Sequence, residues 1–378
     1  MFPDLLIVGG GVIGLSIADV ALRAGLRVRV LDKSAPARES SWAGAGMITC
    51  RPRPRHRAGV PDYHDLTLLS AEQYPLWNDR LKAETGIDIG YRVSGALELL
   101  TASESEAEFD EAAQSFLKGG AERGIAVRRL SRDETLAREP SLDAHAAAGA
   151  LEFPNEAQIR TPWLTRALIA SIEKRSGNID SGLSVADIAL DPNGTNASGV
   201  LLSSGERIEA GATVFAAGAW SGGFRELRRL APALAKVQPV RGQMLCYNTD
   251  AKLASRLLTC GPHYLVPRGD GVLLAGATHE HAGFENATTP EGFAELTAFS
   301  HSILPALKTL EPVKSWAGLR PGLSGRHPLI GPVRGAKNLF VACGHYRNGL
   351  TLAPATAELL VDVILGRTPK VAMGGWTP

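Results

Sequence analysis

The sequence predicts an α/β protein of two domains, in which a parallel sheet binds a dinucleotide and a second domain is rich in antiparallel strands. Three observations support this prediction. With 378 residues, the chain is too long for one ordinary hydrophobic core. Residues 4–32 contain a strand, a glycine-rich turn, a helix and a second strand in that order. Strand-like runs then dominate residues 237–276.

The N-terminal turn has the glycine pattern of a dinucleotide-binding loop. Residues 5–8 form a short apolar run that suits a buried strand, and Gly9, Gly11 and Gly14 then match G-x-G-x-x-G. Gly9 allows a tight turn, and Gly11 lets the backbone approach a pyrophosphate. Gly14 allows the helix and the strand to pack closely.

The segment after the glycines completes the motif. Residues 12–24 have helical periodicity, and the start of such a helix presents N–H groups and a positive dipole end to phosphates. Residues 28–31 form a second strand, and Asp32 at its end can accept a bond from a ribose hydroxyl. This order predicts a Rossmann-like site; the alternative is a glycine-rich turn in a parallel sheet without a ligand.

The overall composition excludes several classes of partner. The chain is 44% hydrophobic and 21% charged, and its 40 basic residues balance 39 acidic ones, so neither nucleic acid nor an anionic membrane is expected. Four scattered cysteines suggest reduced thiols rather than disulfides or a zinc site. No apolar run reaches the roughly 18 residues of a membrane span, and the first strand leaves no room for a signal peptide. We therefore expect a cytoplasmic protein without a metal site.

Residues 33–48 are expected to form a loop rich in small residues. It begins at Lys33, directly after Asp32 at the end of the second strand, so we expect it near the dinucleotide. Ser40 and Ser41 can offer hydroxyls to phosphate. Three small or flexible residues can approach a ring closely: Ala45, Gly46 and Met47. The segment RPRPRHR at 51–57 follows, where proline prevents a helix; we interpret it as a solvated basic surface loop, with a partner-binding role as the alternative.

Caps and apolar runs locate the remaining elements. Capping boxes at Ser103/Glu106 and Ser131/Glu134, and proline after Thr161 and Thr289, mark helix starts. The helices expected lie near residues 66–85, 103–123, 131–139, 161–175, 289–304 and 350–365. Further strands are expected at 95–100, 149–153, 185–190, 199–203, 206–209, 213–216, 263–268, 271–278, 316–319 and 339–342.

Dinucleotide-binding signals recur near residues 4–48, 180–222 and 325–366, so the two domains are expected to be discontinuous. We assign residues 1–85, 150–222 and 325–378 to the dinucleotide-binding domain. Residues 86–149 and 223–324 are assigned to the second, substrate-binding domain.

Four segments carry a family resemblance: HYLVPR at 263–268, GVLLAGAT at 271–278, WAGLRPG at 316–322 and GHYRNGLTLAPAT at 344–356. With the N-terminal fingerprint and VFAAGAWSG, they make the chain resemble the glycine oxidase and D-amino-acid oxidase family, most closely the bacterial glycine oxidases of thiamine biosynthesis, over essentially its whole length. The resemblance implies FAD, two domains and oxidation of a small amine at its α-carbon. The imine would then hydrolyse, and oxygen would re-oxidise the flavin to give hydrogen peroxide.

The substrate carboxylate needs a planar cation, and the resemblance places Arg320 of WAGLRPG in that role. Pairing of Arg320 with an internal carboxylate is the alternative. The Tyr264 hydroxyl can orient the same carboxylate, unless Tyr264 is a core residue. His279 stands where such glycine oxidases carry a methionine bordering the active site, which leaves the preferred amine open; Met47 and Arg347 complete the expected substrate contacts.

The turn before the last helix is the second expected cofactor segment, because its N–H groups and dipole would face the flavin ring and favour hydride acceptance there. Arg347 can add charge at that place or hold the substrate; a surface ion pair is its alternative. The segment comprises His345, Tyr346, Arg347, Asn348, Gly349, Leu350 and Thr351. Val12, Ile13, Val185 and Gly218 complete the expected cofactor residues.

No catalytic acid or base is expected, because the lone pair of a neutral amine can assist hydride departure to flavin N5. Sarcosine oxidases tether their flavin through a cysteine in the segment corresponding to 316–330, where this chain has none, so we expect non-covalent FAD. Two rivals remain: a dehydrogenase that passes electrons from D-amino acids, sarcosine or another amine to a non-oxygen acceptor, and an RNA-modifying or scaffold subunit. A homo-oligomer is plausible from the resemblance alone.

Overall fold

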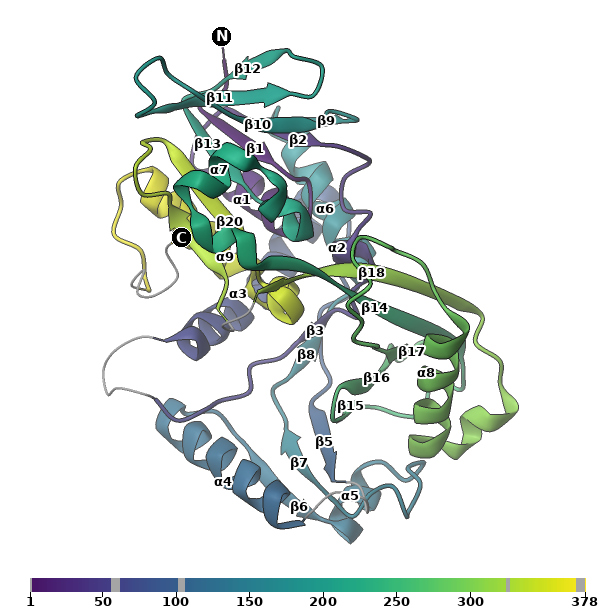
Figure 1. Ribbon diagram of the computed structural model, residues 1–378. Coiled ribbons are helices and arrows are strands. Elements are labelled where there is room, and N and C mark those ends of the chain that lie inside the picture. The colour runs from purple at the N-terminus through teal and green to yellow at the C-terminus, as the bar shows by residue number, and fades with distance from the viewer. Residues whose placement is uncertain (1, 56–61, 101–105, 324–326, 372–377) are drawn as a thin grey trace.

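The computed structural model describes residues 2–55, 62–100, 106–323, 327–371 and 378. Its chain forms two bodies, one around the N-terminal strands and one around a large sheet, and the long strands β14 (Val237–Asn248) and β18 (Lys314–Leu323) run from one body into the other (Figure 1). His56, Arg57 and Ser103 lie outside the described residues, so the last part of the Arg-Pro segment and one predicted capping box are not described.

The first body contains a six-stranded sheet within the described residues. Its pairs are parallel except the one at the β19 edge, and the apolar run Leu5–Val8 is buried in its middle, as expected for a parallel strand covered on both faces. In spatial order the strands are β19 (Leu329–Pro332), β20 (Leu339–Cys343), β13 (Ala212–Phe215), β1 (Leu5–Val8), β2 (Val28–Asp32) and β9 (Asn178–Ser181).

Alternation along the strands divides the core of this body between the two faces of the sheet. Leu5 and Ile7 point to the face covered by helices, whereas Leu6 and Val8 point to a layer of short strands and turns. The helices are α1 (Val12–Arg23), α3 (Tyr63–Thr85), α6 (Thr161–Lys174) and α9 (Gly349–Ile364). The other layer contains β10 (Val185–Leu190), β11 (Ala197–Leu202), β12 (Arg207–Glu209) and α7 (Arg225–Leu230).

The second body is built on an eight-stranded sheet, which is antiparallel except for the β15–β5 pair. One face packs against α8 (Pro290–Ile303), and the other carries Tyr264 and Met244 in a separate apolar cluster. The order is β18, β14, β17 (Val272–Gly276), β16 (His263–Pro267), β15 (Leu257–Cys260), β5 (Ala96–Leu100), β7 (Gly149–Phe153) and β6 (Arg128–Ser131). Helices α4 (Glu106–Arg123) and α5 (Arg132–Arg138) complete this body.

Both sheets are assembled from separate stretches of the chain, so the predicted α/β class with a Rossmann-like sheet and a discontinuous, largely antiparallel second sheet is confirmed. The exact domain boundaries stay a prediction. A small sheet of β3 (Met47–Ile48), β8 (Ala157–Gln158) and β4 (Arg92–Val93) adds strands that the sequence did not predict. Among the described helices, none is long and apolar enough to cross a membrane.

Three local expectations are corrected by long-range contacts. The expected loop at 33–48 contains the short helix α2 (Ser40–Ala43). Helix α6 has Arg160 as its N-cap, and the Thr161 hydroxyl instead donates to the carbonyls of Trp42 and Gly44 at 3.1 Å each. Arg51 is not part of a solvated loop, since it pairs with the carboxylates of Glu98 and Glu156. The capping box of Ser131 and Glu134 is confirmed.

Candidate active site

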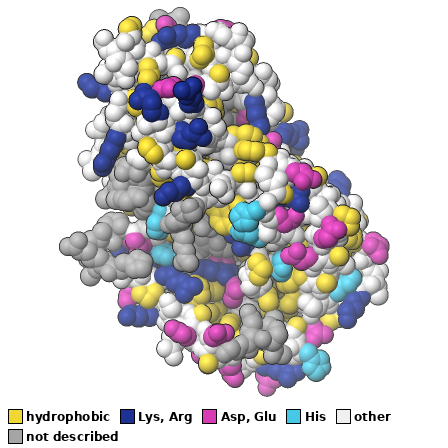
Figure 2. Space-filling model, in the orientation of Figure 1, with side chains coloured by type: hydrophobic (Ala, Val, Ile, Leu, Met, Phe, Trp, Pro, Cys, Tyr) yellow, Lys and Arg dark blue, Asp and Glu magenta, His cyan; other side chains and the backbone are white. Residues whose placement is uncertain are grey.

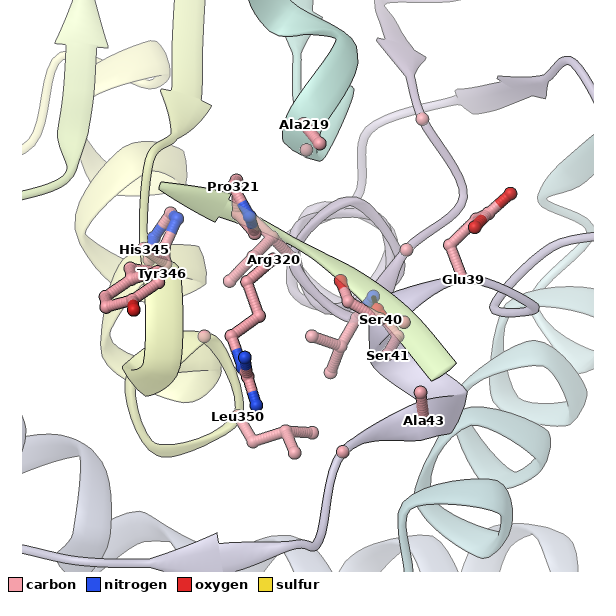
Figure 3. Close-up of a pocket in the computed structure, with 18 of the residues that line it drawn as sticks. Glu39, Ser40, Ser41, Ala43, Ala219, Arg320, Pro321, His345, Tyr346 and Leu350 are labelled. Carbon is pink, nitrogen blue, oxygen red and sulfur yellow. Dashed lines mark hydrogen bonds between the residues drawn. The ribbon is translucent and has the colours of Figure 1, made fainter. Parts of the chain in front are cut away.

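A cavity of about 620 Å³ lies between the two sheets and reaches from the β1–α1 turn to the wall of the eight-stranded sheet. This volume is within the range of small-molecule and cofactor sites. The predicted site residues all line it except Gly14, His279 and Thr351. Figure 3 shows how its walls come from distant parts of the chain, with Ser40 and Ser41 on α2, Arg320 on β18, and His345, Tyr346 and Leu350 at the start of α9.

The glycine turn at one end is packed too closely for side chains. Gly9 has φ +109°, and a Cβ atom there would lie 2.5 Å from the carbonyl oxygen of Ala216. A Cβ on Gly14 would lie 1.9 Å from the carbonyl oxygen of Gly9, so Gly14 holds helix and strand together behind the cavity. Gly11 is the N-cap of α1 and lines the cavity, which leaves the helix start facing this space.

Asp32 supports the shape of the turn from the end of β2. Its Oδ2 accepts a hydrogen bond from the backbone N–H of Gly10 at 2.7 Å, and its Oδ1 accepts one from Ser34 at 2.9 Å. Asp32 also lines the cavity, where a carboxylate is suited to a ribose hydroxyl. The next residue, Lys33, places its Nζ 3.4 Å from the ring centre of Trp220, which also lines the cavity.

The short helix α2 brings the predicted serines to the same place. Ser41 Oγ accepts a hydrogen bond from the N–H of Val12 at 2.8 Å and so occupies one donor of the first turn of α1. Ser40 lies beside it on the cavity wall. The following residues are held from the other sheet, because Arg268 donates to the carbonyl oxygen of Ala45 at 2.6 Å.

Arg268 is a site residue that sequence reasoning missed, although it ends the HYLVPR motif. It also donates to the carbonyl oxygen of Ile159 at 2.9 Å and to Oε1 of Gln158 at 3.0 Å. Burial, with some repulsion from Arg160 and Arg92, lowers the pKa of Arg268 to about 9. Arg268 holds the segment around Ala45 beside the cavity. The sequence did not predict this role because the bonded residues lie far from Arg268 in the chain.

The second predicted cofactor segment forms the turn into α9. Tyr346 has φ +51°, an unusual backbone conformation for a residue with a side chain, and residues 345–350 line the cavity. His345 is buried, and its Nε2 lies 3.1 Å from the Thr356 hydroxyl. Burial lowers the pKa of His345 to about 3, so its ring is neutral. Thr351 points away from the cavity lining, toward the carbonyl oxygen of Met47 at 3.4 Å.

Arg320 lies on the cavity wall without a carboxylate partner among the described residues. Its guanidinium lies over Gly242, where a Cβ atom would come within 2.1 Å of Nη2, and Nη1 donates to the carbonyl oxygen of Thr278 at 3.0 Å. In Figure 3 the side chain extends from β18 toward Leu350. The internal ion pair considered as an alternative for Arg320 is therefore absent from the described part of the chain.

The other residues predicted to contact the substrate have polar groups that contact neighbouring protein atoms. The Tyr264 ring lines the cavity, but it is buried and its hydroxyl lies 3.3 Å from Met244 Sδ. Arg347 donates to the carbonyl oxygen of Pro262 at 2.8 Å. His279 is exposed and does not line the cavity, and its Nδ1 lies 2.6 Å from the hydroxyl of Tyr346, which does.

The arrangement of these residues fits a flavin dinucleotide. A glycine turn and a helix start suit a pyrophosphate, Asp32 suits a ribose, and the start of α9 suits an electron-rich ring. Segments from both ends of the chain meet in one cavity, which also contains Arg320, an arginine without a carboxylate partner among the described residues. That combination suits a redox cofactor beside an anionic substrate.

Comparisons with known proteins find relatives over the whole chain. The FAD dependent oxidoreductase family model matches residues 4–363. The glycine oxidase of Pseudomonas aeruginosa is 35% identical over 378 residues, covering 100% of this chain and 99% of the relative. The bifunctional protein ThiO/ThiG of Synechocystis is 31% identical, over 99% of this chain and 53% of its own length. The crystal structure of the glycine oxidase from Geobacillus kaustophilus covers 99% of this chain and 98% of its own, with a TM-score of 0.88 and 29% identity.

Proposed function

Since the chain belongs to the family of FAD-dependent oxidoreductases, we propose that it uses FAD to oxidise the α-carbon of glycine or another small amino acid. The observation that carries this proposal is the single cavity that joins the glycine turn of α1 to the unpaired Arg320. The glycine oxidase relatives support the same reaction class.

The residues that line the cavity divide into two groups. The α1 turn, Asp32, α2 and the start of α9 hold the cofactor, and Arg320 binds the substrate carboxylate through two parallel hydrogen bonds. Tyr264 and Met47 shape the space beside Arg320, and Arg347 lies where cofactor and substrate meet. The backbone around Gly349 stabilises negative charge at the ring end of the cofactor.

Bound FAD would supply an acceptor for a hydride from the α-carbon, and oxygen would be the oxidant of the reduced cofactor. The protein aligns the amine and excludes water rather than providing a general base, because the substrate nitrogen's own lone pair assists hydride departure. For glycine the overall reaction consumes one glycine, one O2 and one water, and it yields glyoxylate, ammonia and hydrogen peroxide. A role in thiamine biosynthesis is part of this proposal, supported by the relative named ThiO/ThiG.

The test is to add glycine, sarcosine, D-alanine and D-proline to the FAD-loaded protein and to measure oxygen consumed, peroxide formed and keto acid formed. One peroxide for each glyoxylate is the expected result with glycine. Glyoxylate without peroxide, appearing only with an added electron acceptor, would instead identify the dehydrogenase. An FAD-loaded protein that oxidises none of these amines would overturn the proposed function.

A further inference from the structure

One rung of residues crosses the eight-stranded sheet and forms a wall of the cavity. Residues directly opposite one another on neighbouring strands have side chains on the same face. In spatial order the rung contains Trp316, Met244, Gly276, Tyr264, Thr259 and Glu98. Met244, Tyr264, Thr259 and Glu98 line the cavity, so this wall is apolar and aromatic in its middle and polar at its β5 end.

The polar end is fixed by Arg51, which also lines the cavity. Arg51 donates through Nη1 to Oε2 of Glu98, through Nη2 to the Thr259 hydroxyl at 2.8 Å, and through Nε to Oε1 of Glu156 at 3.1 Å. The Thr259 hydroxyl donates to the same oxygen of Glu98. One guanidinium thus serves two carboxylates, and all of its donor nitrogens are in use.

One carboxylate oxygen of this network, Oε1 of Glu98, takes no part in these hydrogen bonds. Both bonds to Glu98 end on Oε2, and Oε1 takes no hydrogen bond from the described part of the chain. The side chain of Glu98 is 22% exposed and lines the cavity, whereas that of Glu156 is 3% exposed and does not. Glu98 therefore has, among the described residues, one carboxylate oxygen without a hydrogen-bond donor, and its side chain lines the cavity.

The two charged ends of the wall are far apart. Arg320 lies over Gly242 of β14, and Glu98 is on β5, four strand spacings away. At about 4.8 Å for each spacing, the two backbones are roughly 19 Å apart, and both long side chains shorten that gap. Glycine bound at Arg320 is too short to reach Glu98, whereas a longer amino acid can extend toward it.

We propose that Glu98 is a specificity-determining residue that accepts a hydrogen bond from a cationic, N–H-bearing group at the far end of the substrate. The inference rests on the proposed oxidase function and deepens it. The substrate class is an amino acid with an ammonium group several bonds from its carboxylate. An apolar group at the same place would displace water from a carboxylate oxygen without replacing its hydrogen bond, which disfavours such substrates.

Two unreactive ligands of equal length test this in the FAD-loaded protein: δ-aminovalerate ends in an ammonium group, and hexanoate ends in a methyl group. Perturbation of the flavin absorbance gives each dissociation constant. We expect δ-aminovalerate to bind about tenfold more tightly in the wild type, and less than about threefold more tightly in Glu98→Gln, because a charge-assisted hydrogen bond is lost. The control is Glu311→Gln, at an exposed position outside the cavity lining, and it should retain the wild-type preference.

Equal or tighter binding of hexanoate by the wild type would overturn the proposal, and so would a preference that persists in Glu98→Gln. If Glu98→Gln does not fold, equal or tighter binding of hexanoate by the wild type still overturns the proposal. Turnover gives a second readout: the ratio of kcat/KM for D-ornithine to that for D-norleucine should fall about tenfold in Glu98→Gln. If Glu98 had only a structural role, the substitution would change kcat/KM for D-ornithine and for D-norleucine by the same factor. Failure of every amine to reduce the flavin would reject the proposed function, while the binding comparison would still judge Glu98.

Discussion

Arg320 is the residue on which substrate binding depends, since its guanidinium faces the cavity without a carboxylate partner among the described residues. Replacing it with alanine removes a charged, bidentate contact that is worth about 1.5–3 kcal/mol, so the KM for glycine should rise roughly ten- to a hundredfold. Arg320→Lys should recover only part of this loss, because an ammonium cannot form two parallel bonds. Steady-state kinetics with glycine check both variants, and an unchanged KM in Arg320→Ala would remove the residue from the substrate site.

His345 makes the stability of the protein depend on pH. Burial lowers its pKa in the folded state to about 3, whereas a free histidine titrates near 6.5. Between these values the unfolded chain binds the extra proton, so stability is fully present above about pH 6.5 and is lost as pH falls toward 3. At about pH 5 the loss from this residue is on the order of 2 kcal/mol.

Urea unfolding of the FAD-loaded wild type and of His345→Gln at about pH 7.5 and about pH 5 measures this effect. The wild type should lose more stability than the variant over that interval. The same acid-induced loss in both proteins would show that His345 is not the residue responsible.

Gly14 should tolerate no side chain, because an added Cβ would lie 1.9 Å from the carbonyl oxygen of Gly9. We expect Gly14→Ala to cost about 2 kcal/mol or more of stability and to weaken FAD binding, since the turn must move. Ser16→Ala on the same helix is the control, because the Ser16 hydroxyl is buried without a partner among the described residues. Thermal unfolding and titration with FAD measure the stability and the FAD affinity of both variants. Equal stability and equal affinity in Gly14→Ala and Ser16→Ala would contradict the packing role of Gly14.

Much of this site was accessible from the sequence at residue level. Gly9, Gly11, Asp32, the two serines and Arg320 were predicted from their place in the sequence, and they line one cavity. The side-chain contacts that each site residue makes could not be predicted from the sequence. That the Tyr264 hydroxyl meets Met244, or that Arg51 meets Glu98 and Glu156, depends on strand register between segments far apart in the chain.

At the level of elements, the segment after β17 joins the two bodies. Phe284 stacks on Trp220 with ring centres 5.5 Å apart, and Asn286 Nδ2 donates to Oε2 of Glu39 at 3.3 Å. Trp220 and Glu39 line the cavity, near Lys33. A segment of the substrate-side body therefore supports the cofactor wall of the other body.

We predict that Phe284→Ala raises the dissociation constant for FAD about two- to tenfold, because an aromatic pair contributes about 0.5–1.5 kcal/mol and Trp220 loses its support. Phe293→Ala on α8 is the control, since Phe293 is also an exposed phenylalanine, at 37% against 55% for Phe284, but does not stack on Trp220. Fluorescence titration of the apoprotein with FAD gives both constants. If the two variants bind FAD with the same affinity, Phe284 does not support Trp220 in FAD binding.

Periodicity and caps predicted most of the elements, and the errors occur where tertiary contacts override local signals. Helix α2 is one turn long and carries no helical period, yet it packs beneath β18, where a Cβ on Gly318 would lie 2.5 Å from that of Ala43. Helix α3 is not among these errors, because a helix was expected over residues 66–85 and the observed helix continues through Pro75. The Thr161 hydroxyl caps no helix because two carbonyls of the α2 segment accept its hydrogen bond.

For the molecule as a whole, the cavity exists only because the chain returns to each sheet. The six-stranded sheet takes strands from residues 5–8 and 339–343, and the eight-stranded sheet takes strands from 96–100 and 314–323. On the face seen in Figure 2, Lys and Arg are frequent on the upper body and Asp and Glu are more frequent on the lower one, although the charges of the whole sequence nearly balance.

The central claim is that this cavity places bound FAD against an amino acid held by Arg320. Anaerobic titration of the FAD-loaded protein with glycine tests it most directly, because flavin reduction is then observed without any assumption about the final electron acceptor. We predict complete, saturable bleaching of the yellow flavin in the wild type, and bleaching that requires far higher glycine in Arg320→Ala. A flavin that stays yellow with glycine and with every other small amine would contradict the account.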